Sequence, residues 1–234
     1  MKPGWQRNIV LFLASQTITL FGSSLVQYAI LWYITLTTDS GTMMTVYIIC
    51  GFLPTFFLSP FAGVWADRYN RKLLIVLSDA FIAASTLLLA VLFFMGHGTI
   101  WLLLLLSALR AVGTGIQTPA VGAILPDIVP QERLMQVNAV NSTIQSVVGL
   151  ASPMASGALM TMTTIEAIFL IDVVTAAIAI AVMLLFLHIP VHAKAAGAQS
   201  TSYLSDLAQG IDYIRKHGYI QRFFVLTAIL FFLL

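Results

Sequence analysis

Three charged residues lie inside long apolar runs of the sequence, and their types are those that carry chemistry in such surroundings. They are Asp79, Arg110 and Asp172. A charge in an apolar environment is costly unless it meets an opposite charge or a water-filled cavity. A carboxyl group there can exchange a proton, or it can accept hydrogen bonds that hold neighbouring helices together. The three residues therefore predict either proton transfer or a buried ion pair that orders a bundle.

A second group of charges is concentrated in one short polar segment between two apolar runs. This segment reads Gly63-Val-Trp-Ala-Asp67-Arg68-Tyr-Asn-Arg71-Lys72. It holds three of the chain's 11 Lys and Arg residues. Basic loops between membrane helices face the cytoplasm. The pattern predicts a polar turn on the cytoplasmic side of a membrane.

The composition is that of an integral membrane protein. Of the 234 residues 59% are hydrophobic and 9% are charged, whereas a soluble domain has roughly a quarter of charged residues. No basic face interleaved with aromatic residues indicates nucleic-acid binding. The lone Cys50 allows no intrachain disulfide, and the four histidines are scattered without ligand spacing, so we predict no metal site. No phosphate-binding glycine loop is present, so ATP is not the expected energy source.

Six apolar runs of roughly the 20 residues that cross a bilayer follow one another. We expect spans at 9–36, 44–64, 73–95, 100–125, 134–160 and 165–187. Ten of the 11 Lys and Arg residues then fall in the predicted inside segments, and Arg110 alone lies within a span. This distribution places the amino terminus and the end of the sixth span inside.

The composition changes after Leu187. We expect a flexible linker at 188–202, then an amphipathic helix at 203–216 on the inner membrane surface. The predicted domains are therefore a six-helix bundle at 1–187, a cytoplasmic linker at 188–222 and the start of a seventh span at 223–234. Twelve residues reach only about 18 Å, short of the roughly 30 Å hydrocarbon core. We interpret the chain as the first half of a transporter of about twelve helices.

An internal repeat runs through the six spans at an offset of 93 residues. Ser59-Pro60 matches Ser152-Pro153, and Asp79 matches Asp172. Because each copy has three spans, the second copy enters the membrane from the opposite side, as in an inverted three-plus-three repeat. Two acids related in this way suggest a shared packing role, such as accepting hydrogen bonds from a neighbouring helix. Proton carriage is the alternative.

The polar segment at 63–72 resembles motif A of the major facilitator superfamily, which joins the second and third helices of those transporters. Asn70 stands where the family usually has Gly, and Asn tolerates left-handed backbone, so we expect the turn to keep its shape. The resemblance implies a gating role for one set of residues: Gly63, Asp67, Arg68, Arg71, Lys72 and Asp127. In the family, the counterpart of Asp67 faces the start of a helix in the other half. An Arg71–Asp127 pair would lock the inner side, the alternative being a solvated pair that contributes little.

The same resemblance implies that the first and fourth spans line a central cavity. Gln16, Gln27 and Arg110 are then the first candidates for contact with substrate or for proton relay. Gly113 and Gly115 after Arg110 only partly match the family's motif B. Hydrogen bonding between helices is the simpler interpretation of the two glutamines. For Arg110 the alternative is an ion pair that orders the bundle.

The fifth span resembles motif C of drug antiporters through Ser152, Pro153 and Gly157. Small residues allow close helix approach, and the proline bends a helix. The second span also carries Ser-Pro at Ser59-Pro60. The repeat by itself therefore accounts for the proline, and this weakens the inference of export.

The chain as a whole is similar to the macrolide-efflux branch of these exporters. This implies a secondary active transporter, not an enzyme, that exports hydrophobic or amphipathic drugs by proton antiport and needs no cofactor besides the proton gradient. It further implies a multi-pass protein of the bacterial cytoplasmic membrane. The expected partners are membrane lipid, a small-molecule drug and a missing carboxy-terminal half, with no nucleic acid. Two alternatives remain: a proton-coupled importer of a small nutrient, and a truncated membrane interaction module that does not transport.

Overall fold

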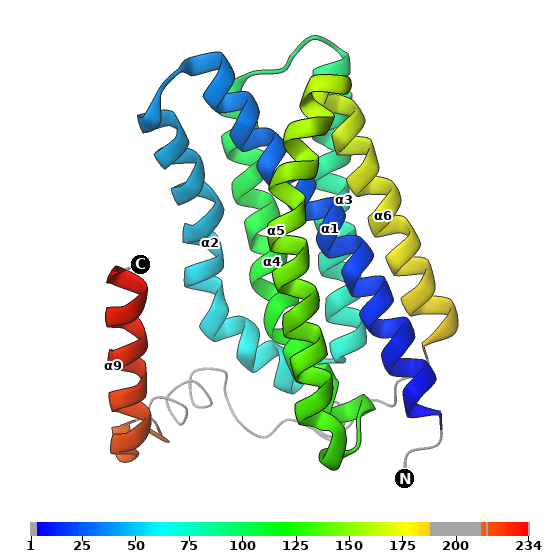
Figure 1. The fold of residues 1–234 in the computed structure, drawn as a ribbon, viewed down its shortest axis with the longest axis vertical. Helices are drawn as coiled ribbons and strands as arrows, with labels where there is room; N and C mark the ends of the chain where they lie inside the picture. Colours follow the sequence, from blue (N-terminus) through cyan, green and yellow to red (C-terminus); the bar gives the residue numbers. More distant parts are fainter. Residues whose placement is uncertain (1–3, 188–211, 214, 234) are drawn as a thin grey trace. The chain divides into compact units, whose positions relative to one another are not determined.

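The computed structural model describes residues 4–187, 212–213 and 215–233. The chain forms two compact units, Met1–Ala196 and Gly197–Leu234. The first unit is a bundle of six long helices (Figure 1). These helices are α1 (Trp5–Thr38), α2 (Gly41–Arg68), α3 (Arg71–Phe94), α4 (Ile100–Ile128), α5 (Leu134–Met162) and α6 (Ile165–Phe186). A 3₁₀ turn, η1 (Gln131–Arg133), precedes α5.

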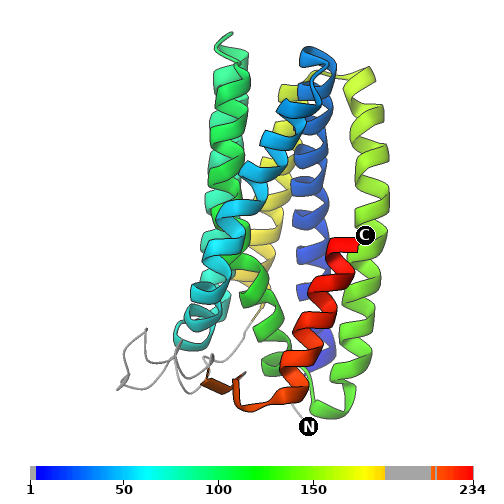
Figure 2. The same ribbon diagram turned by 90° about the vertical axis from the view of Figure 1, so that its left-hand side faces the viewer.

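The neighbour relations in the bundle follow the predicted repeat. The main packing partners form a series in which α2 packs on α4, α4 on α3, α3 on α6, α6 on α1, and α1 on α5. Exchanging the first three helices with the last three leaves this series unchanged. The helices run side by side along the bundle, as Figure 2 shows from a second direction. The packing thus agrees with an inverted three-plus-three repeat.

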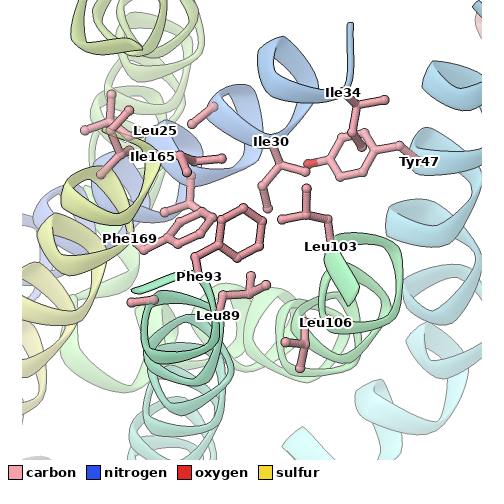
Figure 3. Packing of buried hydrophobic residues seen from close by; sticks show 14 of the residues in the cluster. Leu25, Ile30, Ile34, Tyr47, Leu89, Phe93, Leu103, Leu106, Ile165 and Phe169 are labelled. Atoms are coloured by element: carbon pink, nitrogen blue, oxygen red, sulfur yellow. The ribbon is translucent and has the colours of Figure 1, made fainter. Parts of the chain in front are cut away.

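Two apolar clusters fill the bundle and are separated by a polar layer. The first cluster, at the end where α1 stops, includes Phe93 and Phe169, whose ring centroids lie 5.7 Å apart edge to face (Figure 3). The second, at the end where α1 starts, includes Phe12 and Met183. Between them each of four helices contributes buried polar side chains. These are Ser15, Gln16 and Thr19 on α1, Ser78, Asp79, Ser85 and Thr86 on α3, Ser107 and Arg110 on α4, and Asp172 on α6.

Five of the described helices are long and apolar enough to cross a membrane, and α5 is the long helix that is not among them. The predicted span at 134–160 is therefore less apolar than we expected. With 29 residues α5 reaches about 43 Å, so its length suffices. Its first half carries a polar stripe at a spacing of three to four residues, Asn138, Ser142 and Gln145, and these side chains are exposed. The stripe lowers the hydropathy of α5, and it gives the helix one polar face.

The polar turn at 63–72 is shorter than predicted. Helix α2 continues to Arg68 and α3 begins at Arg71, so Tyr69 and Asn70 alone connect them. Asn70 is extended, with φ −64° and ψ 110°, and its side chain accepts a hydrogen bond from the Leu73 N–H at the start of α3. The expectation of left-handed backbone at Asn70 is therefore wrong, because the residue caps a helix instead. Among the described non-glycine residues, Asp39 after α1 has positive φ.

The second unit contains α9 (Gly218–Leu233), which begins five residues before the predicted seventh span at 223–234. Its 16 residues extend about 24 Å. The predicted linker at 188–202 lies outside the described residues. So does the predicted amphipathic helix at 203–216, apart from 212–213 and 215–216.

Candidate functional site

A pocket of about 760 Å³ is formed by α1, α2, α4 and α5, with one residue from α3. The predicted cavity residues Gln16, Gln27 and Arg110 all line it. Its wall also carries the aromatic residues Tyr28, Tyr47 and Phe52 and the amides Gln117, Asn141 and Gln145. An apolar pocket with a few converging polar groups is the usual form of a small-molecule site. The pocket is therefore the candidate binding site.

The two predicted glutamines differ in their surroundings. Gln16 is buried, and its Nε2 lies 3.6 Å from Met183 Sδ on α6, a weak contact between helices. The side chain of Gln27 is exposed, while its backbone carbonyl accepts a hydrogen bond from Tyr47 Oη at 2.8 Å. Gln27 is thus the better placed of the two to bind a ligand in the pocket.

Arg110 forms an ion pair with Asp172 in the polar layer. Its Nη1 lies 2.7 Å from Asp172 Oδ2 and also contacts the Thr86 hydroxyl. Thr86 donates to the same carboxylate oxygen at 2.8 Å, and Ser23 Oγ donates to the other oxygen at 2.9 Å. Arg110 Nη2 donates to the Ser23 carbonyl at 3.3 Å. This network joins α1, α3, α4 and α6, and Arg110 also borders the pocket.

Asp79 is equally buried but has a different set of partners. Its Oδ1 accepts hydrogen bonds from Gln117 Nε2 at 2.5 Å and from Thr19 Oγ1 at 3.3 Å. Its Oδ2 is buried and has no hydrogen-bond partner among the described residues. The two acids, which the repeat led us to expect in one shared role, therefore differ in their environments.

Sequence analysis did not identify Gln117, Thr19, Thr86 or Ser23 as site residues. Helical spacing contains part of this information. Gln117 follows Arg110 by seven residues, two turns of α4, and Ser23 follows Thr19 by four, about one turn of α1. This spacing places Gln117 on the same face of α4 as Arg110, but it does not predict that Gln117 binds Asp79 on α3.

The motif A residues meet at the end of the bundle where α2 stops and α3 starts. Arg71 Nη1 lies 2.8 Å from Asp127 Oδ2 at the end of α4. Arg71 also donates to the carbonyls of Ala66 at 2.9 Å and Ala123 at 2.8 Å, and its Nη2 lies 3.4 Å from Asp67 Oδ1. One guanidinium therefore ties together the ends of α2 and α4 and the start of α3.

The other motif A residues lie around this contact. Lys72 Nζ donates to the Leu187 carbonyl at 2.7 Å, where it caps the end of α6. Arg68 is buried in the last turn of α2. A Cβ atom on Gly63 would meet nothing within 4 Å, so packing within this chain does not require a glycine there.

The Ser-Pro segment of α5 packs on α1. Ser152 and Ser156 are fully buried, and Ser156 Oγ donates to the Leu25 carbonyl at 3.0 Å. Ser152 Oγ has no partner among the described residues. Helix α5 continues through Pro153, and Gly157 lies against Trp32 of α1. The small residues thus serve close approach of the two helices.

Comparisons with known proteins agree with this arrangement. Residues 12–234 match the sequence model of the Major Facilitator Superfamily. The chain is 28% identical over 213 residues to "Macrolide efflux protein A" of Streptococcus pyogenes, covering 91% of this chain and 52% of that protein. It is 23% identical over 222 residues to "Staphyloferrin A transporter" of Staphylococcus aureus, covering 94% and 54%. The chain thus spans about half the length of the curated relatives it matches.

Two solved structures show the same fold. One is a bacterial homologue of the human lysosomal transporter Spinster in an inward-facing, unoccupied conformation, with a TM-score of 0.61 and 17% identity, over 88% of this chain and 47% of that one. The other is the peptide transporter POT (E310Q mutant) in complex with sulfate, with a TM-score of 0.66 and 17% identity, over 95% and 46%.

Proposed function

Because the chain belongs to the Major Facilitator Superfamily, we propose that it supplies the amino-terminal half of a secondary transporter that exports hydrophobic or amphipathic drugs of the macrolide type. The family is one of membrane transporters. The observation that carries the proposal is the pocket of about 760 Å³ between α1, α2, α4 and α5. The name of the relative from Streptococcus pyogenes supports macrolide export.

The pocket suits a ligand without strong charge. Among the described residues of its wall Arg110 is the one cationic side chain, and the buried carboxylate of Asp172 neutralises it. The remaining polar groups are amides and hydroxyls, which can bind the hydroxyl and carbonyl groups of an amphipathic drug. The aromatic residues Tyr28, Tyr47 and Phe52 offer apolar surface. An amphipathic ligand therefore fits better than a multiply charged one.

The exposed faces of α2 and α5 support a second half that completes the pocket. Helix α2 is barely buried within the bundle, and Phe52, Phe56 and Phe57 on it are exposed. On α5 the exposed stripe of Asn138, Ser142 and Gln145 is polar. A polar stripe at membrane depth needs protein or water beside it rather than lipid. We assign this cover to a second six-helix half.

The proposal includes the direction of transport, out of the cytoplasm, and its energy source, the proton gradient. Among the described basic residues of the first unit, Arg7, Arg68, Arg71, Lys72 and Arg133 lie at the end of the bundle where α1 starts, and Arg110 lies in the polar layer, which supports a cytoplasmic position for that end in the bacterial inner membrane. The contacts of Arg71 with Asp127 and with the ends of α2 and α4 support a gate there. Buried acids in the polar layer support coupling to protons. No further cofactor is required.

The test measures radiolabelled erythromycin in drug-sensitive bacteria that express the complete transporter containing this chain. We expect lower accumulation than in empty-vector cells, and a protonophore should abolish the difference. Gly122→Trp should abolish efflux, because Gly122 lines the pocket and has open space beside it. Leu105→Trp on the same helix is the matched control, since Leu105 is 61% exposed and lies outside the pocket. Equal accumulation with and without the transporter would refute export, and higher accumulation would indicate an importer.

A further inference from the structure

Asp79 is a buried acid that forms no ion pair with the basic residues that the structure describes. It lies eight residues into α3, about 12 Å from the start of the helix, and is 2% exposed. The nearby basic residues are engaged elsewhere, since Arg110 pairs with Asp172, Arg71 with Asp127, and Lys72 with the Leu187 carbonyl. An ionised carboxylate without a counter-charge is costly at this depth, whereas the neutral acid is not.

The charged groups on the helices that pack against α3 do not stabilise the ionised form of Asp79. On α4 they are Arg110 and Asp127, on α6 they are Glu166 and Asp172, and on α2 they are Asp67 and Arg68. Asp172 carries a charge of the same sign, so it does not stabilise an ionised Asp79. Of the remaining groups, Arg110 is held by Asp172, and Arg68 and Asp127 lie in the last turns of α2 and α4.

The repeat provides an internal comparison. Asp172 has what an ionised carboxylate needs, namely the cation of Arg110 and the hydroxyls of Thr86 and Ser23. Shifted by the repeat offset of 93 residues, Thr86 corresponds to Ala179, Ser23 to Ile116 and Arg110 to Thr17. The positions that correspond to the partners of Asp172 therefore offer Asp79 neither the positive charge nor those two hydroxyls. This difference accounts for the buried Oδ2 of Asp79 that has no partner.

Thr19 and Gln117 connect Asp79 to the pocket. Both bind Asp79 Oδ1, and both line the pocket, whereas Asp79 itself does not. An amide donates through its nitrogen to a carboxylate and, after rotation, accepts through its oxygen from a protonated carboxyl; a hydroxyl can do the same. The two partners can therefore satisfy either protonation state of Asp79. A ligand that takes the hydrogen bonds of Gln117 or Thr19 would change that state.

We propose that Asp79 is the proton-binding acid of this half, that it exchanges its proton with pocket water beside Thr19 and Gln117, and that Asp172 serves instead as the partner of Arg110. The proton leaves a hydronium ion in the pocket and adds to a carboxylate oxygen of Asp79, which becomes neutral. The link to drug export rests on the function proposed above, whereas the protonation of Asp79 is a property of this chain.

The first experiment measures protonation directly. The chain in lipid nanodiscs is titrated with pH and followed by infrared absorption of its protonated and ionised carboxyl groups. We expect a buried protonated carboxyl band that Asp79→Asn removes and the double variant Arg110→Gln/Asp172→Asn retains. A band that survives in Asp79→Asn, or that disappears in the double variant, would overturn the assignment.

A second variant keeps the test decisive if Asp79→Asn does not insert. Gln117→Met preserves the length of the side chain and removes the amide that bonds to Asp79 Oδ1. Its expected effect is a shift of the protonated carboxyl band in frequency and in titration midpoint. An unchanged band would show that the titrating acid is not the one bonded to Gln117.

The third experiment connects Asp79 to transport in the complete protein. One coupled proton can sustain an accumulation ratio of about tenfold for each pH unit of gradient, so we expect Asp79→Asn to lower this ratio from about tenfold to about one while erythromycin binding and exchange persist. Gradient-driven efflux that is unchanged in Asp79→Asn would overturn the coupling role. If the unaltered protein moves no erythromycin, the proposed function fails, while the infrared result still decides the protonation of Asp79.

Discussion

Replacement of Arg110 by Met tests whether the buried ion pair holds the bundle together. The variant leaves the Asp172 carboxylate, which is 0% exposed, without its cation. Breaking one side of a buried pair costs about 3–5 kcal/mol. Ser23 and Thr86 still donate to the carboxylate, so we expect a loss near 3 kcal/mol, which is about a hundredfold in the unfolding equilibrium.

The double variant Arg110→Met/Asp172→Leu distinguishes the net contribution of the ion pair from the cost of leaving one charge unpaired. Replacing a buried pair by apolar residues is often neutral or stabilising by about 1–4 kcal/mol, because no charge remains to be desolvated. We therefore expect the double variant to recover most of the stability that the single variant loses. Thr86 remains as a hydroxyl that can bond to the Ile82 carbonyl of its own helix, so it is not left unpaired.

The assay is reversible unfolding of the chain in mixed micelles at increasing SDS fraction, followed by circular dichroism. Arg133→Met is the matched control, since Arg133 is exposed and, among the described residues, its side chain bonds to Gln136 at 3.2 Å. It should change stability by less than about 0.5 kcal/mol. If Arg110→Met is as stable as the control, or if the two single losses add in the double variant, the pair does not order the bundle.

Three further predictions concern the gate, the helix contact and the motif A turn. In the complete transporter, Arg71→Ala and Asp127→Ala should each impair efflux, and the charge swap should restore part of it; strictly additive losses in a double-mutant cycle would contradict direct pairing. Gly113→Ala should destabilise the bundle by about 1–3 kcal/mol in SDS unfolding, because a Cβ there would lie 2.6 Å from Ile82 Cγ1; unchanged stability would refute this contact. Asn70→Ala should lower stability by about 1 kcal/mol, whereas Asn70→Asp should not, because Asp also caps a helix; equal effects would contradict the capping role.

The helices of the first unit could largely be predicted from the sequence, because long apolar runs alternate with short polar segments. Their ends were less accurate. Helix α2 extends five residues past Gly63 to Arg68, since a polar residue at the end of a membrane helix can remain helical. The backbone of Asn70 was predicted wrongly, because a resemblance to a glycine position says nothing about the capping bond to Leu73.

The sequence did not predict which residues pair with the buried charges. The sequence contains Arg110 and Asp172, and it predicts that each needs a partner, but 61 residues separate them along the chain. Their contact depends on how α4 and α6 pack around α3, which hydropathy does not encode. Arg71 and Asp127 could be paired beforehand because a known motif places them together. What distinguishes Asp79 from Asp172 lies in side chains of neighbouring helices, and their spacing becomes informative only once those helices are placed.

The inverted repeat allows the environments of Asp79 and Asp172 to be compared position by position. Two equivalent helices, α3 and α6, place a carboxyl group at equivalent positions in one polar layer. Symmetry by itself would give both acids the same energetics, and a layer with two fixed ion pairs could not exchange a proton. A layer with two unpaired acids would lose the contact that ties α6 to α4. Asp172 has Arg110, Thr86 and Ser23 as partners, whereas the corresponding positions of the repeat hold Thr17, Ala179 and Ile116. This difference divides the two tasks. Asp172 thereby fixes the bundle through a buried pair, while Asp79, next to the pocket through Gln117, keeps a site whose charge can change.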